Sequence, residues 1–334
     1  MSRVTIADVA RAAEVSTATV SNALNGTGRL TASTRARVRA VAASLGYGGP
    51  TASRTLALTV TTYGHRRWDF ADVPFFAQAI AAATAAAHKR GYALTALPSA
   101  PDDSMWSTLP VAGVLVLDSP GEDPVVRILR ARGLPLAFDG HPTEPRPGEV
   151  YVDNDHRATT HEVLDHFAAQ GSDRVALIAG VADDHYTRTC VAAYREWCAG
   201  RGIPPRVLPM AVGDEDGRTY DAVLSGADRP NAIYGLYDPC GRRVLASAAR
   251  CGLSVPADLL LVCASEDPSY ATGTPTAPAV STVSLDPRRT ATTAVTALID
   301  LIEHPQQEPA SVTVPARLHI RASSLGERAS ASRT

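Results

Sequence analysis

The chain has 334 residues and a formal net charge of −2, and its 45% hydrophobic and 20% charged residues exclude a mainly disordered protein. No apolar run approaches the roughly 18 residues of a membrane span, and residues 1–20 do not resemble a signal peptide, so we expect a cytoplasmic protein without membrane contact. Five cysteines without a Cys-x-x-Cys pair argue against a disulfide framework or a zinc site and favour small core residues.

The amino-terminal segment is basic. Residues 1–54 contain seven arginines and two acidic residues, a net charge of +5, which leaves −7 for the rest of the chain. A basic end on an acidic body is typical of a protein that places one end against phosphates. On charge alone, a solvated basic face explains the pattern equally well.

The first helix is expected directly after Thr5, which is a suitable N-cap. Ile6, Val9, Ala10 and Ala13 recur at helical spacing and form its apolar stripe, so the helix should end near Ala13.

A second helix follows after a tight turn. Glu14 and Val15 form the turn, Ser16 caps the helix, and Val20 and Leu24 face the first helix. Two short helices joined in this way are typical of a helix-turn-helix.

A third helix should begin at Ser33 or Thr34 and end at Gly46. Its predicted apolar face consists of Val38, Val41, Ala42 and Leu45. The alternative is a three-helix packing unit without DNA affinity, which the basic charge disfavours.

The stretch VTIADVARAAEVSTATVSNALNGTGRLTASTRARVRAVAASLGY resembles, without a gap, the headpiece of the lactose repressor and galactose repressor family. The resemblance implies that the second helix enters the major groove and that Thr17, Ala18 and Asn22 read bases. An amide can pair bidentately with adenine, and the two shorter side chains can offer methyl groups to thymine. Many family members have Arg where Asn22 stands. The residues that resemble the family's backbone contacts are Thr5, Ser16, Thr19, Ser21, Asn25, Thr34 and Arg37.

Downstream, strands and helices alternate as in a parallel α/β protein. The predicted strands are 56–61, 93–97, 111–117, 134–138, 175–178, 232–236 and 259–263. The predicted helices are 74–90, 124–132, 156–170, 190–201 and 242–251. Two such series indicate two doubly wound parallel-sheet subdomains behind an all-α helix-turn-helix headpiece.

The resemblance extends over nearly the whole chain, through VAGVLVLDS, VYVDNDHRATTHEVLDHFAAQGSDRVALIAG, LSVPADLLLV and LHIRASS. It implies a periplasmic-binding-protein-like core, a homodimer on a palindromic double-stranded DNA operator, and a small-molecule effector between the subdomains. The expected divisions are a headpiece at 1–47, a linker at 48–55, an N subdomain at 56–152 and 282–308, a C subdomain at 153–281 and 309–324, and a disordered tail at 325–334.

The effector is expected to be a sugar or a sugar derivative. Residues that resemble or lie near the family's effector contacts are Phe75, Phe76, Asp139, Arg188, Tyr237, Asp238 and Ser265. Phe75 and Phe76 could equally belong to the core. Three positions depart from the family, which usually has Asn at Tyr237, Asp at Ser265 and Arg at Cys190. A site that reads hydroxyl groups needs placed polar side chains, so these changes disfavour an ordinary pyranose.

The linker GYGGPTASRTLALTV also departs from the family, whose hinge helix carries a Leu that wedges into the minor groove. Leu56 could be that wedge. The favoured alternative places Leu56 in the first strand and truncates the hinge helix.

No enzyme, cofactor or metal is expected. His156, His161 and His166 are five residues apart, which turns successive rings by about 140° on a helix, too far for shared metal ligation. Asp183, Asp184 and His185 could form a metal or acid–base cluster, but a solvated loop is favoured.

The sequence therefore predicts a sequence-specific DNA-binding transcriptional regulator, most simply a repressor, whose operator affinity depends on the effector. The alternative is a small-molecule-binding protein of the same core fold without effector-controlled DNA regulation. The basic helical segment at residues 1–46 argues against that alternative.

Overall fold

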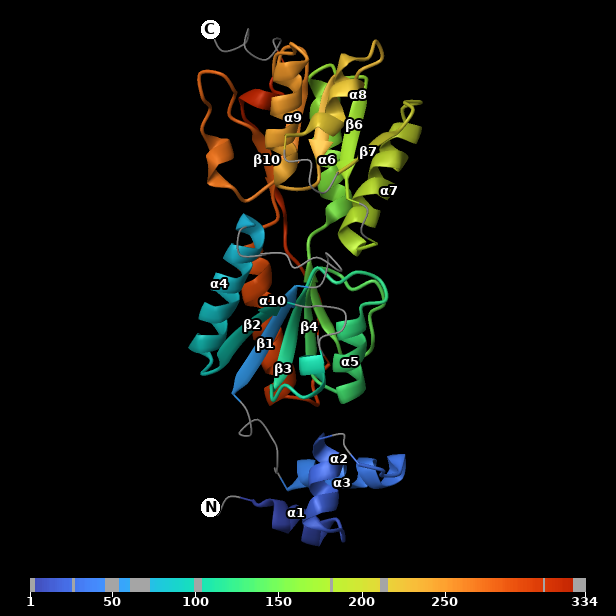
Figure 1. The fold of residues 1–334 in the computed structure, drawn as a ribbon, viewed down its shortest axis with the longest axis vertical. Coiled ribbons are helices and arrows are strands. Elements are labelled where there is room, and N and C mark those ends of the chain that lie inside the picture. The colour runs from blue at the N-terminus through green and yellow to red at the C-terminus, as the bar shows by residue number, and fades with distance from the viewer. Residues whose placement is uncertain are drawn as a thin grey trace.

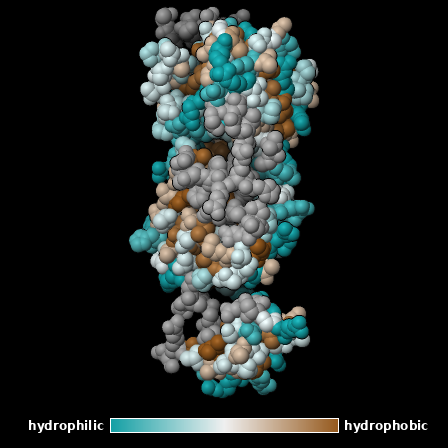
Figure 2. Space-filling model, viewed as in Figure 1, coloured by the Kyte–Doolittle hydropathy of each residue, from teal (hydrophilic) through white to brown (hydrophobic). Residues whose placement is uncertain are grey.

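The computed structural model describes residues 4–25, 28–45, 54–60, 73–98, 104–180, 183–210, 216–308 and 310–326. Figure 1 shows three bodies along the longest axis: a helical headpiece, an N subdomain and a C subdomain. On the face drawn in Figure 2, hydrophilic side chains gather along the outer edges of the core and at the end of the headpiece remote from the core.

The headpiece consists of three helices, α1 (Ile6–Ala12), α2 (Thr17–Asn25) and α3 (Ala32–Ser44). Hydroxyl side chains cap the second and third: Ser16 Oγ accepts from Thr19 N at 3.1 Å, and Thr31 Oγ1 accepts from Thr34 N at 3.2 Å. The third helix therefore begins at Ala32, slightly before the expected start. The small hydrophobic core of the headpiece consists of Val9, Ala10, Ala13, Val20, Ala23, Val38 and Ala42.

One prediction for the headpiece, that Leu45 belongs to the apolar face of the third helix, is wrong. The prediction of a truncated hinge lies mostly outside the described residues. Leu45 follows the end of α3 and is 37% exposed, so it does not belong to the apolar face of that helix. Residues 46–53, which hold most of the expected linker and the truncated hinge, lie outside the described residues.

The N subdomain is a parallel six-stranded sheet in the order β11-β5-β4-β3-β1-β2. Its strands are β1 (Thr55–Val60), β2 (Ala93–Pro98), β3 (Gly113–Leu117), β4 (Leu136–Asp139), β5 (Val150–Asp153) and β11 (Val312–Thr313). Helices α4 (Pro74–Lys89) and α10 (Pro287–Glu303) pack on one face, and α5 (Pro124–Arg132) packs on the other with Trp106 of the short turn Ser104–Ser107. Burial on both faces explains the nearly continuous apolar strands.

The C subdomain has a six-stranded sheet in the order β12-β10-β9-β8-β6-β7, in which only β12 is antiparallel to its described neighbour. Its strands are β6 (Val175–Ala179), β7 (Arg206–Pro209), β8 (Ala232–Gly235), β9 (Leu260–Ala264), β10 (Ser281–Ser284) and β12 (Arg317–His319). Helices α6 (His156–Ala169) and α7 (His185–Ala199) cover one face, and α8 (Asp221–Ser225) and α9 (Pro239–Arg250) cover the other. Short 3₁₀ turns lie at Arg218–Tyr220, Pro268–Ala271 and Ala322–Ser324. All five cysteines lie here; four are buried and Cys251 is half-buried.

Two expected subdomain boundaries need correction. β10 pairs with β9 and β12, so residues 282–284 belong to the C subdomain. β11 pairs with β5, so residues 312–313 belong to the N subdomain. The chain therefore crosses between subdomains after β5, after β10 and after β11. Of the expected tail, residues 327–334 lie outside the description, whereas the Gly326 N–H donates to Gln170 Oε1 at 3.0 Å.

Candidate nucleic-acid interface and intersubdomain site

The start of α2 presents the expected base-reading side chains. Thr17 and Ala18 are exposed, and Asn22, one helical turn further, is half-buried. Asn22 packs against the turn before α3, where Gly28 has a φ of +72° and a Cβ would lie 2.9 Å from Asn22 Nδ2. The absence of a side chain at Gly28 therefore leaves room for the Asn22 amide.

Most of the expected backbone-contacting hydroxyls also hold the headpiece together. The Thr5 N–H and hydroxyl donate to Asp8 Oδ2 at 2.9 and 2.6 Å, so Asp8 is fixed at the start of α1. Ser16 Oγ and Thr19 Oγ1 lie 2.9 Å apart. Thr34 Oγ1 is 2.8 Å from Thr31 Oγ1, Ser21 is half-buried, and the Asn25 side chain lies outside the described residues.

Several headpiece arginines form no ion pair with another of the described residues. Arg11 forms an ion pair with Asp8 at 3.1 Å. Within the described headpiece, residues 4–25 and 28–45, no ion pair is found for Arg29, Arg35, Arg37 or Arg39. These cations are therefore available to external anions such as phosphates.

Leu56 is fully buried in β1, in the centre of the N-subdomain core. A side chain held between a sheet and two helices cannot insert between bases, so its alternative assignment as a minor-groove wedge is wrong. Phe76 is also a core residue, 4% exposed, and Phe75 stacks edge-to-face on it with centroids 5.1 Å apart. Among the alternatives left open for these two residues, the structure places Phe76 in the core.

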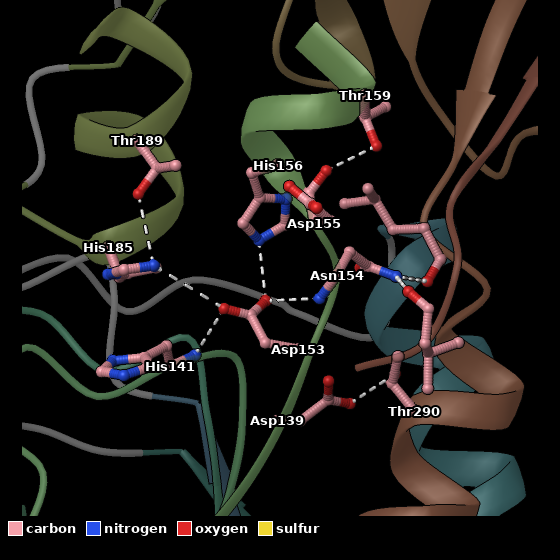
Figure 3. Close-up of polar contacts among 12 residues, drawn as sticks. Asp139, His141, Asp153, Asn154, Asp155, His156, Thr159, His185, Thr189 and Thr290 are labelled. Atoms are coloured by element: carbon pink, nitrogen blue, oxygen red, sulfur yellow. Dashed lines mark hydrogen bonds and ion pairs between the residues drawn. The ribbon is translucent and has the colours of Figure 1, made fainter. Parts of the chain in front are cut away.

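Asp139 ends β4 and lies at the edge of the sheet that faces the C subdomain (Figure 3). The Thr290 hydroxyl on α10 donates to Asp139 Oδ2 at 3.0 Å. Burial raises the pKa of Asp139 to about 8, which the Thr290 hydrogen bond only partly offsets.

Asp153, at the first crossing between subdomains, is a hub of hydrogen bonds that the sequence analysis did not identify. Its carboxylate accepts from His141 N at 3.0 Å, Asn154 N at 2.8 Å and His156 Nε2 at 2.7 Å (Figure 3). Burial raises the pKa of Asp153, but these hydrogen bonds outweigh burial and hold the pKa below its usual value.

Asn154 joins all three crossings. Its Nδ2 donates to Leu285 O at 3.1 Å, after β10, and to Val314 O at 2.8 Å, after β11. A single amide thus ties together three segments that are far apart in the sequence. Asp153 ends β5 and Asn154 follows it directly, and that position at the carboxyl end of a strand was the available sequence signal.

The two subdomains also touch directly beside these crossings. Gly121 N donates to Asp183 O at 2.8 Å, and Gln78 Nε2 on α4 donates to Glu266 O at 3.2 Å. The rings of His141 and His185 stack across the interface with centroids 4.4 Å apart. In this conformation the described faces of the two subdomains are therefore in contact.

Tyr237, Asp238 and Ser265 lie together on the C-subdomain side. Tyr237 Oη is 2.5 Å from Thr187 Oγ1, and a Cβ at Gly180 would lie 2.7 Å from that oxygen, so the ring packs closely against the end of β6. Ser265 Oγ donates to Asp238 Oδ1. Arg242 bridges Asp238 at 3.0 Å and Asp267 at 2.6 Å.

Arg188 does not join this group. It is half-exposed on α7 and pairs with Asp183 at 3.3 Å. Cys190 lies in the core of the C subdomain, where burial raises the pKa of its thiol to about 12. The Cys190 thiol therefore cannot replace a ligand-binding guanidinium.

The prediction of a solvated loop at Asp183, Asp184 and His185 is only partly correct. Asp183 is exposed, but Asp184 is 3% exposed and caps α7 by accepting from Thr187 N at 2.7 Å. Burial raises the pKa of Asp184, and the Thr187 hydrogen bonds oppose that shift. In the described residues no group of three or more His, Cys, Asp or Glu side chains is arranged to hold a metal ion.

A cavity of about 250 Å³ lies beside the amino-terminal end of α5. It is lined by residues that include Ser119, Arg127, Arg130, Thr143 and Arg146, and by none of the expected effector residues. No helix in the described part of the chain is both long and apolar enough to cross a membrane.

Two family models match the chain. The model described as "Bacterial regulatory proteins, lacI family" matches residues 5–48, and the model described as "Periplasmic binding protein-like domain" matches residues 164–324. The HTH-type transcriptional regulator CelR of Thermobifida fusca is 28% identical over 282 residues, 78% of this chain and 81% of that protein. The HTH-type transcriptional repressor PurR of Escherichia coli O1:K1 / APEC is 26% identical over 335 residues, 94% of this chain and 95% of that protein.

Solved structures share the fold over nearly the whole chain. A transcriptional regulator CelR–cellobiose complex has a TM-score of 0.72 at 23% identity and covers 96% of this chain and 100% of its own. The lac repressor dimer bound to operator and the anti-inducer ONPF has a TM-score of 0.65 at 19% identity and covers 97% of this chain and 100% of its own.

Proposed function

Because the chain belongs to the lacI family of bacterial regulatory proteins, we propose that it represses transcription from an operator to which its headpiece binds. A small molecule between the core subdomains modulates this binding. The observation that carries the proposal is the exposed, basic helix-turn-helix, in which the start of α2 is free to enter a major groove.

Thr17, Ala18 and Asn22 read bases, and exposed cations of the headpiece such as Arg37 bind phosphates. The exposure of the first two side chains and the packing of Asn22 against Gly28 support this division of roles. Backbone contacts come from Thr5, Ser16, Thr19, Ser21, Asn25, Thr34 and Arg37, which position the helix without reading sequence.

Replacing Asn22 with Ala should weaken binding to the cognate operator by about 1–3 kcal/mol and relax preference at one base pair, because a bidentate base contact is lost. The matched variant Arg37→Ala should weaken binding to all DNA alike and lower the salt slope by about one. Fluorescence anisotropy on cognate and random duplexes measures both effects. Equal losses on the two duplexes for Asn22→Ala would contradict the base-reading role, and no DNA binding by the native chain would favour a ligand-binding protein without DNA regulation.

The effector binds where the two sheets face each other, close to Asp139, Tyr237, Asp238 and Ser265. Sheets of this kind bind ligands at the carboxyl ends of their strands. Asp139 ends β4, and the other three residues follow β8 and β9. The CelR structure is a complex with cellobiose, which makes a sugar or sugar derivative the first class to test. Loss of the arginine at Cys190, and the Tyr237 ring against Gly180, argue for an effector other than an ordinary pyranose.

The functional unit is a homodimer, because two headpieces related by a two-fold axis read both halves of a palindrome. The outer face of α4 supports dimerisation through the core: Ala77, Ala81 and Ala85 are exposed there, and such small side chains allow another helix to approach closely.

Sedimentation of the full chain at micromolar concentration should therefore give a dimer, and Ala81→Asp should shift it to monomer by burying a charge in the interface. The control Ala192→Asp places the same charge on an exposed alanine of α7 and should leave the dimer intact. A monomeric native chain, or a dimer that tolerates Ala81→Asp, would exclude this interface.

A further inference from the structure

Two histidine rings from different subdomains are stacked at the crossing region (Figure 3). His141 follows β4 in the N subdomain, and His185 is the first residue of α7 in the C subdomain. Their centroids are 4.4 Å apart and their planes differ by 25°. Any movement that opens the subdomains at this edge must separate the two rings.

Among the described residues, few charged groups surround the pair. Asp153 Oδ2 accepts from His141 N at 3.0 Å and lies 3.9 Å from His185 Nε2, but the closest ring to this carboxylate is His156, at 2.7 Å from Oδ1. One carboxylate thus faces the imidazoles of His156 and His185 and accepts from the main chain of His141.

The other described neighbours of the two rings add little negative charge that could offset a positive charge on the rings. On α7, Arg188 adds positive charge and is paired with Asp183, while the buried Asp184 is held by Thr187. The Tyr151 ring of β5 lies 4.2 Å from the His141 ring, and Thr189 Oγ1 is 3.2 Å from His185 Nε2.

We propose that the His141–His185 stack is a pH-sensitive latch between the two subdomains, closed while the rings stack as neutral imidazoles and released by protonation of His185. Neutral rings stack favourably, and His141 Nδ1, 2.7 Å from Pro142 O, is assigned as the protonated nitrogen of a neutral ring. A positive charge on His185 is poorly compensated at this place, because the Asp153 carboxylate lies 3.9 Å from His185 Nε2 and is already bonded to His156.

The direction of the effect follows from linkage. Burial lowers the pKa of His185 below its ordinary value of 6.5, with Asp153 acting in the opposite direction. A base whose pKa is lower in the closed form binds protons more readily in the open form. The closed form is therefore fully favoured above pH 6.5. It loses this advantage as the pH falls through the lowered pKa that His185 has in the closed form.

The nine histidines are His65, His88, His141, His156, His161, His166, His185, His304 and His319. None lies in residues 1–54, so histidine titration cannot act on the headpiece directly. The effect of the latch on operator affinity rests on the proposed function, whereas the latch itself does not.

Small-angle X-ray scattering of the full chain at pH 7.5 and 5.5 tests the latch. The radius of gyration of the native chain should increase at pH 5.5, and that of His141→Phe/His185→Phe, which keeps two stacked rings without titration, should not change. The control His304→Phe alters an exposed histidine at the end of α10 and should respond like the native chain. The single variant His185→Phe removes the ring whose pKa burial lowers, so it should respond less than the native chain, and it serves if the double variant does not fold.

An unchanged native radius between the two pH values, or the same increase in the phenylalanine variants, would overturn the latch. A second readout is operator binding, whose Kd should change at least about fivefold between the two pH values in the native chain and not in the double variant. Absence of operator binding at both pH values would refute the proposed function and leave the scattering result to decide on the latch.

Discussion

Replacing Asp153 with Ala should lower the free energy of unfolding by about 3–5 kcal/mol at pH 7, because three donors lose their acceptor. The carboxylate is 13% exposed and accepts from His156 Nε2 and from the N–H groups of His141 and Asn154. Urea unfolding followed by circular dichroism measures the change. Since the pKa of Asp153 is depressed, its stabilisation is present above the ordinary value of 3.8 and is lost as the pH falls through the lower folded value.

Asp153→Asn is the matched control, because it keeps one oxygen acceptor at the same place without the charge. It should lose a smaller part of the stability than Asp153→Ala and should remove the loss of stability caused by protonation of this carboxyl at acid pH. A change of less than about 1 kcal/mol for Asp153→Ala would mean that water satisfies the three donors as well as the carboxylate does.

Replacing Asn154 with Leu should lower the free energy of unfolding by about 2–4 kcal/mol, because the carbonyls of Leu285 and Val314 both lose their donor. The side chains are similar in size, so little of the effect should come from a cavity. Urea unfolding again measures the change. Because the amide joins all three crossings, protease cleavage after β10 and β11 should also become faster.

Gln78→Leu is the control for Asn154→Leu. The Gln78 amide also links the subdomains, but through one half-buried hydrogen bond of 3.2 Å to Glu266 O; its other bond is an exposed one from Arg288 within the N subdomain. Its loss should cost about 1 kcal/mol or less. Equal effects of the two substitutions would show that Asn154 has no special role at the crossings.

The headpiece could be predicted closely from the sequence because its signals are local. The caps at Thr5 and Ser16 and the apolar spacing of α1 and α2 involve residues three or four apart, and the structure has both helices where expected. The start of α3 was missed by one or two residues because Thr31, Ser33 and Thr34 are all suitable caps. Their competition is settled by the hydrogen bond from Thr34 N to Thr31 Oγ1.

The α/β class of the core was also predictable, since strands buried on both faces are apolar almost throughout. The start of α7 was not: it begins at His185, five residues before the predicted Cys190, because Asp184 is buried and caps the helix. Strands β5, β7, β10, β11 and β12 and helix α10 were not among the predicted elements. Of these strands, β7, β11 and β12 lie at sheet edges and have exposed residues, without a continuous apolar run.

The sequence by itself determined the headpiece, the two apolar sheets and the residue types available for DNA, because these depend on composition and short-range spacing. Only the tertiary structure decided that β11 joins the N-subdomain sheet beside β5, about 160 residues earlier, and that Asn154 binds Leu285 and Val314. It also decided that His141 stacks on His185. The physical reason is that pairing between distant segments depends on how two sheets close over their helices, and no local pattern encodes the partner of a particular carbonyl or ring.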